Sequence, residues 1–463
     1  MARLYLPFVS VLLLVCLTNG AVRSGTKDGS EEWGYVQVRP KAHMFWWLYR
    51  SPYRVEDSSK PWPIILWLQG GPGASGTAIG NFQEVGPLDT DLKKRNSTWM
   101  RVADLLFVDN PVGAGYSFVE DKELLVQTDE EAANDFTTLL KKLFNRNKNL
   151  QNRSLYIVAE SYGGKFAVTI ALAALRAISS GSLKLHLGGV ALGNSWISPE
   201  DYVLSWGPLL KDVSRLDTNG AEEAYSLATK IKQQITDSQF MEAFISWSTL
   251  ENLIIGSSNA VDFYNFLLDS AMDPTSPTLA DISEGVAIRG YSRYLTSIQS
   301  SSDGHDPLSD FMNGPIKKKL SIIPPNVEWG GQENDVFDAL GSDFMRPRIK
   351  EVDELLAKGV NVTVYSGQLD VICSTKGTQA WMEKLKWEGL HGFRNADRNP
   401  LYCGNGSTTK GFTKSFQNLH FYWILNAGHF VPVDQPCTAL KMVGLITQSP
   451  AASCSEPRFT LKQ

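Results

Sequence analysis

Short apolar segments recur along the chain, and each of them ends close to a Gly, Pro, Asn or Asp residue. Their hydrophobicity is nearly continuous and lacks the alternation expected of a strand with one solvent-exposed face. Strands buried on both faces have this pattern, because helices cover both sides of a parallel sheet. Six segments are therefore predicted to be strands: 63–69, 104–110, 154–160, 187–194, 361–367 and 420–426.

The segments between these strands carry apolar residues at helical spacing. In residues 129–144, one face of the predicted helix holds Ala132, Phe136, Leu139, Leu140 and Leu143. Similar patterns predict helices at 164–178, 346–358 and 436–446. Because strands alternate with helices, the sequence predicts an α/β fold with a mostly parallel central sheet flanked by helices.

One long stretch departs from this alternation. Residues 199–325 are richer in Ser, Asp and Gln than the rest of the chain and have a mostly helical pattern. We interpret them as an inserted, mainly helical cap. The core is then built from two parts of the chain, residues 31–198 and 326–463.

The N-terminus has the features of a secretory signal peptide. Arg3 precedes a short apolar run at residues 4–17, and small residues follow it. We predict a signal peptide at residues 1–22, with cleavage between Gly20 and Gly25. No later run approaches eighteen consecutive apolar residues, so no membrane span is predicted.

Four Asn-x-Ser/Thr sequons support the secretory route. The protein is expected to be secreted, with a lysosomal location as the alternative. The predicted glycosylation sites are Asn96, Asn152, Asn361 and Asn405.

Four cysteines remain after the signal peptide removes Cys16. An even number in an oxidising compartment predicts one or two disulfides, with three possible full pairings. No two of them have the Cys-x-x-Cys spacing of a zinc ligand pair, so no metal site is predicted. The four are Cys373, Cys403, Cys437 and Cys454.

Composition and charge limit the possible partners. The chain has 463 residues, 43% of them hydrophobic and 11% aromatic, which is enough for a large core. A formal net charge of −5 argues against nucleic acid, because binding phosphates needs a clustered basic surface. The single basic run, residues 317–319, is interpreted as a solvated face.

The segment "YIVAESYGG", residues 156–164, places a serine between a predicted strand and a predicted helix. Such a turn exposes the hydroxyl of a nucleophile and is usually written Gly-x-Ser-x-Gly, since strand and helix pass close together there. Ala159 replaces the first glycine but adds only one methyl group. Ser161 is therefore a candidate nucleophile, and the alternative is an ordinary loop with a surface serine.

A nucleophilic serine needs a histidine base and a carboxylate that orients it. His429 follows the predicted strand 420–426 and precedes the last helix, and Asp370 follows the strand 361–367. The chain order Ser161, Asp370, His429 is typical of α/β hydrolases. The other histidines are expected to be core, strand or loop residues: His43, His186, His305, His391 and His420.

The transition state of acyl transfer also needs two N–H donors for its oxyanion. The main chain of Tyr162, directly after the candidate nucleophile, is expected to supply one. The glycine-rich loop after strand 63–69 is expected to supply the other through Gly71, because a glycine lets substrate approach the backbone closely.

The same loop has an alternative interpretation as a dinucleotide-binding motif, because residues 71–76 match Gly-x-Gly-x-x-Gly. That motif requires a helix to begin at the glycines, and Gly80, Gly86 and Pro87 interrupt any such helix. We therefore predict no cofactor.

Five segments together resemble the serine carboxypeptidase family over nearly the whole mature chain: "WLQGGPGASG", "LLFVDNPVGAGYSF", "AESYGGK", "GQLDVIC" and "AGHFVP". The resemblance implies an α/β-hydrolase fold with a helical insertion, and removal of single residues from peptide or protein C-termini. It implies a triad of Ser161, Asp370 and His429, and oxyanion donors at Gly71 and Tyr162. It also implies that the substrate carboxylate is held by Gln69, Gly70 and Glu160.

A protonated Glu160 can donate a hydrogen bond to a carboxylate, which favours acidic pH. Gln69, Asn110 and Ala74 stand where the family usually has Asn, Gln and Cys, respectively. Cys373 is either a thiol beside the active site or a partner of Cys437. The alternatives are an acyltransferase or esterase, or a glycoprotein of the same fold with weak or no peptidase activity. A monomer or a homodimer is expected.

Overall fold

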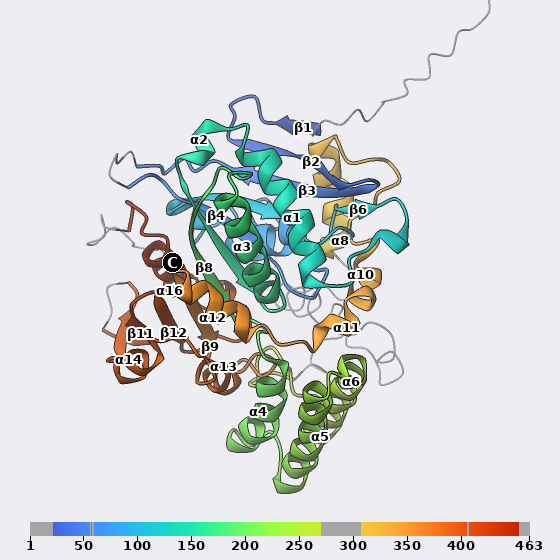
Figure 1. Cartoon of the computed structure of the whole chain (residues 1–463), viewed down its shortest axis with the longest axis vertical. Coiled ribbons are helices and arrows are strands. Elements are labelled where there is room, and N and C mark those ends of the chain that lie inside the picture. The colour runs from blue at the N-terminus through green and yellow to red at the C-terminus, as the bar shows by residue number, and fades with distance from the viewer. Residues whose placement is uncertain (1–21, 56, 58–59, 270–306, 405–406, 453–463) are drawn as a thin grey trace, which may run out of the picture.

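A single mixed sheet crosses the protein (Figure 1). The computed structural model describes residues 22–55, 57, 60–269, 307–404 and 407–452, and within them this sheet has twelve strands. In spatial order its strands are β1 (Val22–Gly25), β2 (Glu31–Arg39), β3 (Ala42–Tyr49), β5 (Asp104–Val108), β4 (Ile64–Leu68), β7 (Ser154–Glu160), β8 (His186–Gly193), β9 (Val362–Gly367), β12 (Leu419–Ile424), β11 (Thr409–Phe416) and β10 (Asn399–Tyr402), with β6 (Phe118–Val119) on β3.

The six central strands, from β5 to β12, are parallel and correspond to the six predicted apolar segments. Their registers align the carboxyl ends: Leu68 pairs with Ala159 and Ile424 pairs with Gly367. The loops that follow these strands therefore meet at one edge of the sheet. This edge is where ligands bind in open α/β sheets.

Antiparallel strands extend the sheet at both sides, and the hydrophobic pattern did not predict them. Every residue of β3 is buried, although the strand contains His43, whose Nε2 lies 3.1 Å from Glu120. β11 has half-buried Thr and Lys residues, so its sequence lacks the continuous apolar pattern from which the other strands were predicted. The fold class is confirmed for the central strands, and the complete sheet is mixed.

Helices cover both faces of the sheet. One face packs against α1 (Asp129–Phe144), α3 (Gly163–Ser179) and α12 (Ile349–Ala357). The other packs against η1 (Gly76–Val85) and α16 (Pro436–Ile446). Within α1 the predicted apolar face is buried, and the Thr128 hydroxyl caps the helix by accepting from the N–H of Glu131.

Three long helices project beyond the carboxyl edge of the sheet (Figure 1): α4 (Pro199–Asp212), α5 (Thr218–Thr236) and α6 (Phe240–Ser257). They lie in the segment predicted as a cap, of which residues 270–306 are outside the described part. After residue 306, the same segment packs on the sheet. There Tyr116 Oη donates to the Met312 carbonyl, and Trp33 Nε1 donates to the Leu320 carbonyl. The boundaries at 199 and 325 stay a prediction.

Short helical segments connect the larger elements. They are η2 (Trp99–Arg101), η3 (Lys122–Leu124), α2 (Lys148–Gln151), α8 (Pro307–Phe311), η6 (Met312–Ile316), α9 (Lys317–Leu320), α10 (Glu333–Ala339), α11 (Gly341–Phe344), α13 (Thr375–Met382), α14 (Leu390–Asn395) and α15 (Val431–Asp434).

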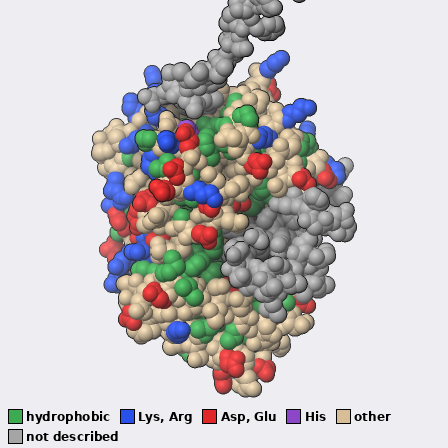
Figure 2. Space-filling view, turned by 90° about the vertical axis from the view of Figure 1, so that its right-hand side faces the viewer, with side chains coloured by type: hydrophobic (Ala, Val, Ile, Leu, Met, Phe, Trp, Pro, Cys, Tyr) green, Lys and Arg blue, Asp and Glu red, His purple; other side chains and the backbone are tan. Residues whose placement is uncertain are grey.

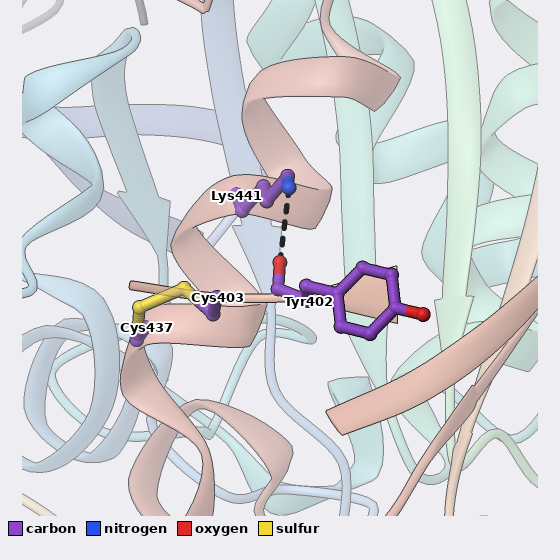
Figure 3. The surroundings of a disulfide bond; sticks show 4 residues. All are labelled: Tyr402, Cys403, Cys437 and Lys441. Atoms are coloured by element: carbon purple, nitrogen blue, oxygen red, sulfur yellow. Dashed lines mark hydrogen bonds between the residues drawn. A yellow bond between two sulfur atoms is a disulfide. The ribbon is translucent and has the colours of Figure 1, made fainter. Parts of the chain in front are cut away.

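A disulfide joins Cys403, just after β10, to Cys437 in the first turn of α16 (Figure 3). Beside it, Lys441 Nζ donates to the carbonyl of Tyr402 at 2.9 Å. Cys373 is buried with a free thiol, so the alternative that paired Cys373 with Cys437 is wrong. Cys454 lies outside the described residues.

The surface carries charges of both signs. On the face seen in Figure 2, Lys and Arg side chains are interspersed with Asp and Glu side chains. Among the described residues, no helix is long and apolar enough to cross a membrane. The predicted signal peptide lies outside the described residues except for Val22, which begins β1.

Candidate active site

Ser161 occupies a strained turn between β7 and α3. Its φ is +59°, in the left-handed region that residues other than glycine rarely adopt. The Ser161 N–H donates to the carbonyl of Gly193 at 3.0 Å, and its own carbonyl accepts from the N–H of Trp196 at 2.9 Å. Hydrogen bonds to the last residue of β8 and to the segment after it thus hold the serine in the strand-to-helix turn predicted for a nucleophile.

The small residues around Ser161 let α3 lie against the sheet. A Cβ atom on Gly163 would come within 2.5 Å of the Leu68 carbonyl oxygen, which is backbone and cannot move aside. Ala159 is fully buried in the core beneath the turn. Helix α3 and strand β4 therefore approach each other closely at Gly163, after the serine. Before the serine, the methyl group of Ala159 packs in the core without a clash.

Asp370 and His429 form a buried pair. His429 Nδ1 lies 2.8 Å from Asp370 Oδ2, and neither side chain is exposed. The His429 N–H donates to the carbonyl of Tyr264 at 2.8 Å, and the Tyr264 ring centroid lies 5.1 Å from that of the imidazole. The structure thus brings together, from the ends of β9 and β12, the two residues predicted to be the acid and the base.

Asn194, one residue beyond β8, was missed by the sequence analysis. Its Nδ2 donates to Asp370 Oδ2 at 2.5 Å and to the Gly428 carbonyl at 3.2 Å, and its Oδ1 accepts from the N–H of Gly367. The amide therefore ties the Asp370 carboxylate to the loop before His429. Its position directly after a predicted strand was the available signal, since the other site residues share that position.

The glycine-rich loop after β4 passes directly over Ser161. A Cβ atom on Gly70 would lie 2.5 Å from Ser161 Cβ and 3.0 Å from its Oγ. Gly71 has a φ of +102°. Position 70 has no room for a Cβ atom, and position 71 has a backbone conformation that residues with a Cβ atom rarely adopt. Both positions therefore require glycine.

Asp109, at the end of β5, anchors this loop. Its carboxylate accepts from Ser75 Oγ at 2.7 Å, from the N–H of Thr77 at 3.0 Å and from the N–H of Tyr116 at 2.9 Å. Burial raises the pKa of Asp109, and these hydrogen bonds act against that rise. The buried Asp109 carboxylate thus holds the predicted oxyanion loop at Ser75 and Thr77.

A small pocket of about 20 Å³ lies against Ser161 and has aromatic walls. Its apolar lining suits part of an uncharged substrate and leaves little room for water. The residues around it are Gly71, Ser161, Tyr162, Trp196, Trp247, Tyr264, Phe344 and Ile372.

A second group of polar side chains is buried beside Ser161, on β4, η1 and β7. Gln69 Nε2 donates to Glu84 Oε1 at 3.0 Å and to Glu160 Oε1 at 3.1 Å, while Trp67 Nε1 donates to Gln69 Oε1 at 2.6 Å. Glu84 also shares a hydrogen bond with Glu160. We use the name carboxyl trio for the two carboxyl groups of Glu84 and Glu160 together with the Gln69 amide that bonds to both.

Burial raises the pKa of Glu84 from an ordinary value of 4.5 to about 7, although its bonds with Glu160 and Gln69 lower it. A hydrogen bond between two carboxyl groups requires a proton on one of them. The sequence analysis named Gln69 and Glu160 but missed Glu84, because the helix η1 that carries it has no catalytic motif.

Asp370, Cys373 and His429 also form a possible metal-ligand set, with ligand atoms within 4.8 Å of one another. Burial, and then the charge of Asp370, raises the pKa of the Cys373 thiol well above its ordinary value. A metal would require the thiolate. His429 Nδ1 and Asp370 Oδ2 are already joined by a hydrogen bond to each other. The chemistry of the set thus favours a hydrogen-bonded pair beside a neutral thiol.

The predicted glycosylation sites differ in accessibility. Asn96 and Asn152 are exposed. Asn361 is half-buried, and its Nδ2 donates to the carbonyl of Gly188 at 3.3 Å. Asn405 lies outside the described residues. Glycosylation stays a prediction, and the exposed pair fits it best.

Comparison with solved structures identifies a similar carboxypeptidase fold. Kex1(delta)p, a prohormone-processing carboxypeptidase from Saccharomyces cerevisiae, matches with a TM-score of 0.73 at 22% identity, covering 90% of this chain and 91% of that chain. At this identity the likeness concerns the fold alone.

Comparison of sequences identifies the family. The family model described as serine carboxypeptidase matches residues 23–449. Serine carboxypeptidase-like 51 from Arabidopsis thaliana is 63% identical, covering 96% of this chain and 98% of its own length. The retinoid-inducible serine carboxypeptidase of Rattus norvegicus is 45% identical, covering 97% of this chain and 98% of its own length. The chain therefore belongs to the serine carboxypeptidase family.

Proposed function

We propose that the protein is a serine carboxypeptidase that hydrolyses the C-terminal peptide bond of peptides or proteins at acidic pH. The observation that carries the proposal is the carboxyl trio, because Glu160 directly precedes Ser161 in the chain. A general serine hydrolase does not need two buried carboxyl groups beside its nucleophile. An enzyme that binds a carboxylate next to the scissile bond can use such groups, when they are protonated, as hydrogen-bond donors.

The triad would act through an acyl-enzyme. Ser161 Oγ attacks the scissile carbonyl while His429 accepts the hydroxyl proton, and His429 then gives that proton to the leaving amine. Asp370 holds the Nδ1–H of the imidazole, which fixes its tautomer. The main-chain N–H groups of Gly71 and Tyr162 stabilise the oxyanion. Water releases the acyl group by the same steps.

The carboxyl trio would bind the terminal carboxylate together with the main chain of Gly70. When Glu84 and Glu160 are protonated, they donate hydrogen bonds to the substrate anion. Because the pKa of Glu84 is about 7, its carboxyl is largely protonated in acid and ionised above neutrality. Ionisation repels the substrate, so binding is expected to weaken as pH rises through 7.

The exposed sequons at Asn96 and Asn152 support the expected secretory location. We propose a secreted protein, with the lysosome as the alternative compartment, and a monomer or homodimer. Glycosylation at Asn96 and Asn152 is part of this proposal, because both side chains are exposed.

The test is hydrolysis of a blocked dipeptide at about pH 5, together with covalent labelling by a serine-directed phosphonate. Wild-type protein is expected to do both, and Ser161→Ala is expected to do neither. Full hydrolysis by Ser161→Ala would overturn the assignment of the nucleophile. Phosphonate labelling without peptide hydrolysis would favour an esterase or acyltransferase. Absence of both in the wild type would favour a glycoprotein with an idle site.

A further inference from the structure

Four charged side chains form a buried ionic cluster behind Tyr162: Asp129, Lys165, Asp343 and Arg348. Each of the four is at most 3% exposed. Arg348 lies 2.9 Å from both carboxylates, and Lys165 Nζ lies 3.6 Å from Asp129 and 3.7 Å from Asp343. The cluster thus places two carboxyl groups and two basic groups within one buried site, and burial raises the pKa of Asp129 to about 6.

The cluster ties together three separate parts of the chain. Asp129 is the first residue of α1, and Lys165 lies in the first turn of α3. Asp343 lies in α11, and Arg348 directly precedes α12. Neither of its cations lies beside Ser161 in the small pocket. The chemistry proposed above does not use any of these charges.

The side chain of Tyr162 contacts this cluster directly. Its phenol Oη donates to Asp129 Oδ1 at 2.9 Å, and Lys165 Nζ lies 4.6 Å from the centre of its ring. The side chain is 1% exposed. Because Tyr162 follows Ser161, a contact that fixes its side chain also fixes its main-chain N–H.

Lys165 also bonds to the main chain of the pocket wall. Its Nζ donates to the main-chain carbonyls of Asp343 and Phe344, at 2.5 Å and 3.3 Å. The Phe344 ring lines the pocket beside Ser161 and stacks on Tyr162, with centroids 5.6 Å apart and planes 19° apart. The cluster thus holds both Tyr162 and the wall that packs on it.

We propose that the buried ionic cluster positions the oxyanion-binding N–H of Tyr162 through the phenol of that residue. Asp129 and the Tyr162 side chain are then positioning residues, which act on the reaction through the main chain. The inference rests on the proposed function only in that Ser161 is the nucleophile and the N–H of Tyr162 contacts the oxyanion. It does not depend on which acyl substrate is hydrolysed.

The test is Tyr162→Phe, which keeps the aromatic ring and removes only the hydrogen bond to Asp129. Losing an oxyanion donor outright costs 10²–10³ in rate, so a misdirected donor is expected to lower kcat about tenfold, with KM changed by no more than about twofold. A blocked amino acid ester serves as substrate, and rates are normalised to sites titrated with a phosphonate.

Two matched inhibitors separate positioning from a purely structural role. A peptide aldehyde adds to Ser161 and places an oxyanion at the donors, whereas the corresponding alcohol forms no such adduct. In Tyr162→Phe the Ki of the aldehyde is expected to rise about tenfold and that of the alcohol to stay unchanged. Equal changes in both, or an unchanged kcat with only a lower Tm, would overturn the proposal.

Two further variants complete the test. Tyr35→Phe removes another buried phenol, which donates to the Tyr116 carbonyl on the other face of the sheet, and is expected to retain wild-type kinetics. In Asp129→Asn the amide still offers Tyr162 a hydrogen bond in either orientation, so kcat per titrated site should stay within about threefold while Tm falls. A large loss of kcat in Asp129→Asn together with an unchanged kcat in Tyr162→Phe would contradict positioning through the phenol, because the charge of Asp129 and not the hydrogen bond would then carry the effect.

This experiment can fail independently of the proposed function. If the enzyme is an esterase, the wild type shows no preference for peptides with a free C-terminus, but the kinetic ratio of Tyr162→Phe to wild type is still measured on the ester. If Ser161 is not the nucleophile, the aldehyde and the alcohol bind the wild type equally.

Discussion

At the scale of single residues, the buried carboxyl group of Glu84 is expected to make stability sensitive to pH and, under the proposed function, substrate binding as well. The folded state holds this acid at a pKa of about 7, above its ordinary value of 4.5. A raised carboxyl pKa means that the folded state binds the proton more tightly than the unfolded state. The stabilisation is therefore complete below about pH 4.5 and is lost as pH rises through about 7.

Glu84→Gln is expected to remove most of this pH dependence. The shift of Glu84 corresponds to on the order of 3 kcal/mol of unfolding free energy, lost by the wild type between about pH 4.5 and pH 8. Glutamine keeps the hydrogen bonds but cannot ionise. Urea unfolding at the two pH values should show a smaller loss for the variant. An equal loss in both proteins would assign the pH dependence to another group.

The residues that sequence alone identified differ in kind from those that it missed. Ser161, Asp370 and His429 each follow a strongly apolar strand, so their position is visible locally. Glu84 and Asn194 act through contacts with residues 15 to 234 positions away in the chain. No local pattern records such contacts. Only the folded sheet, which aligns the strand ends, brings these groups together.

At the scale of elements, the turn between β7 and α3 depends on close packing at Gly163 and not at residue 159. The carbonyl of Leu68 leaves no room for a Cβ atom on Gly163, whereas the Ala159 methyl is packed in the core. Ala159, the residue that departs from the Gly-x-Ser-x-Gly motif, is therefore accommodated within strand β7.

Two matched variants test this assignment. Ala159→Gly restores the usual motif and is expected to change kcat by less than about twofold, with a cost of about 1 kcal/mol in stability. Gly163→Ala must push α3 away from β4, so kcat is expected to fall about 10- to 100-fold because Ser161 moves with the helix. Kinetics and urea unfolding check both. A similar loss of kcat in the two variants would contradict the assignment.

The disulfide between Cys403 and Cys437 closes a segment of 34 residues that contains β11, β12 and His429. Crosslinking such a segment restricts the unfolded chain, so Cys403→Ser with Cys437→Ser is expected to lose about 3 kcal/mol of stability. Reductant should lower the Tm of the wild type but not of this double variant. Cys373→Ser is the control, since its thiol is free, and it should respond to reductant like the wild type.

The parallel strands were predictable because their burial was two-sided, and β3 is an exception, since it is also buried throughout but was not predicted. The six parallel strands have continuous apolar sequences, because helices cover both of their faces. The antiparallel strands at the sides of the sheet carry half-buried polar residues or, in β3, a histidine within an aromatic run. Their pairing is decided by neighbouring strands and not by their own sequence pattern.

At the scale of the whole molecule, the parallel sheet brings distant segments of the chain to one edge. The carboxyl trio, the turn at Ser161, Asp370 and His429 lie in or shortly after β4, η1, β7, β9 and β12, and the helices α4 to α6 project beyond this edge (Figure 1). The aromatic wall of the pocket combines Trp247 of α6 with core residues. The sequence predicted the six parallel strands, whereas the division into a core and an inserted cap stays a prediction, because the helices α4 to α6 carry no catalytic motif.

The central claim is that this architecture recognises the free carboxylate of a peptide C-terminus through protonated carboxyl groups. The most direct measurement is kcat/KM for one peptide with a free C-terminus and for the same peptide amidated, at about pH 5 and pH 8. The account predicts at least about a hundredfold preference for the free acid at pH 5, which falls at pH 8 as Glu84 ionises. Equal rates for the acid and the amide at pH 5 would contradict it.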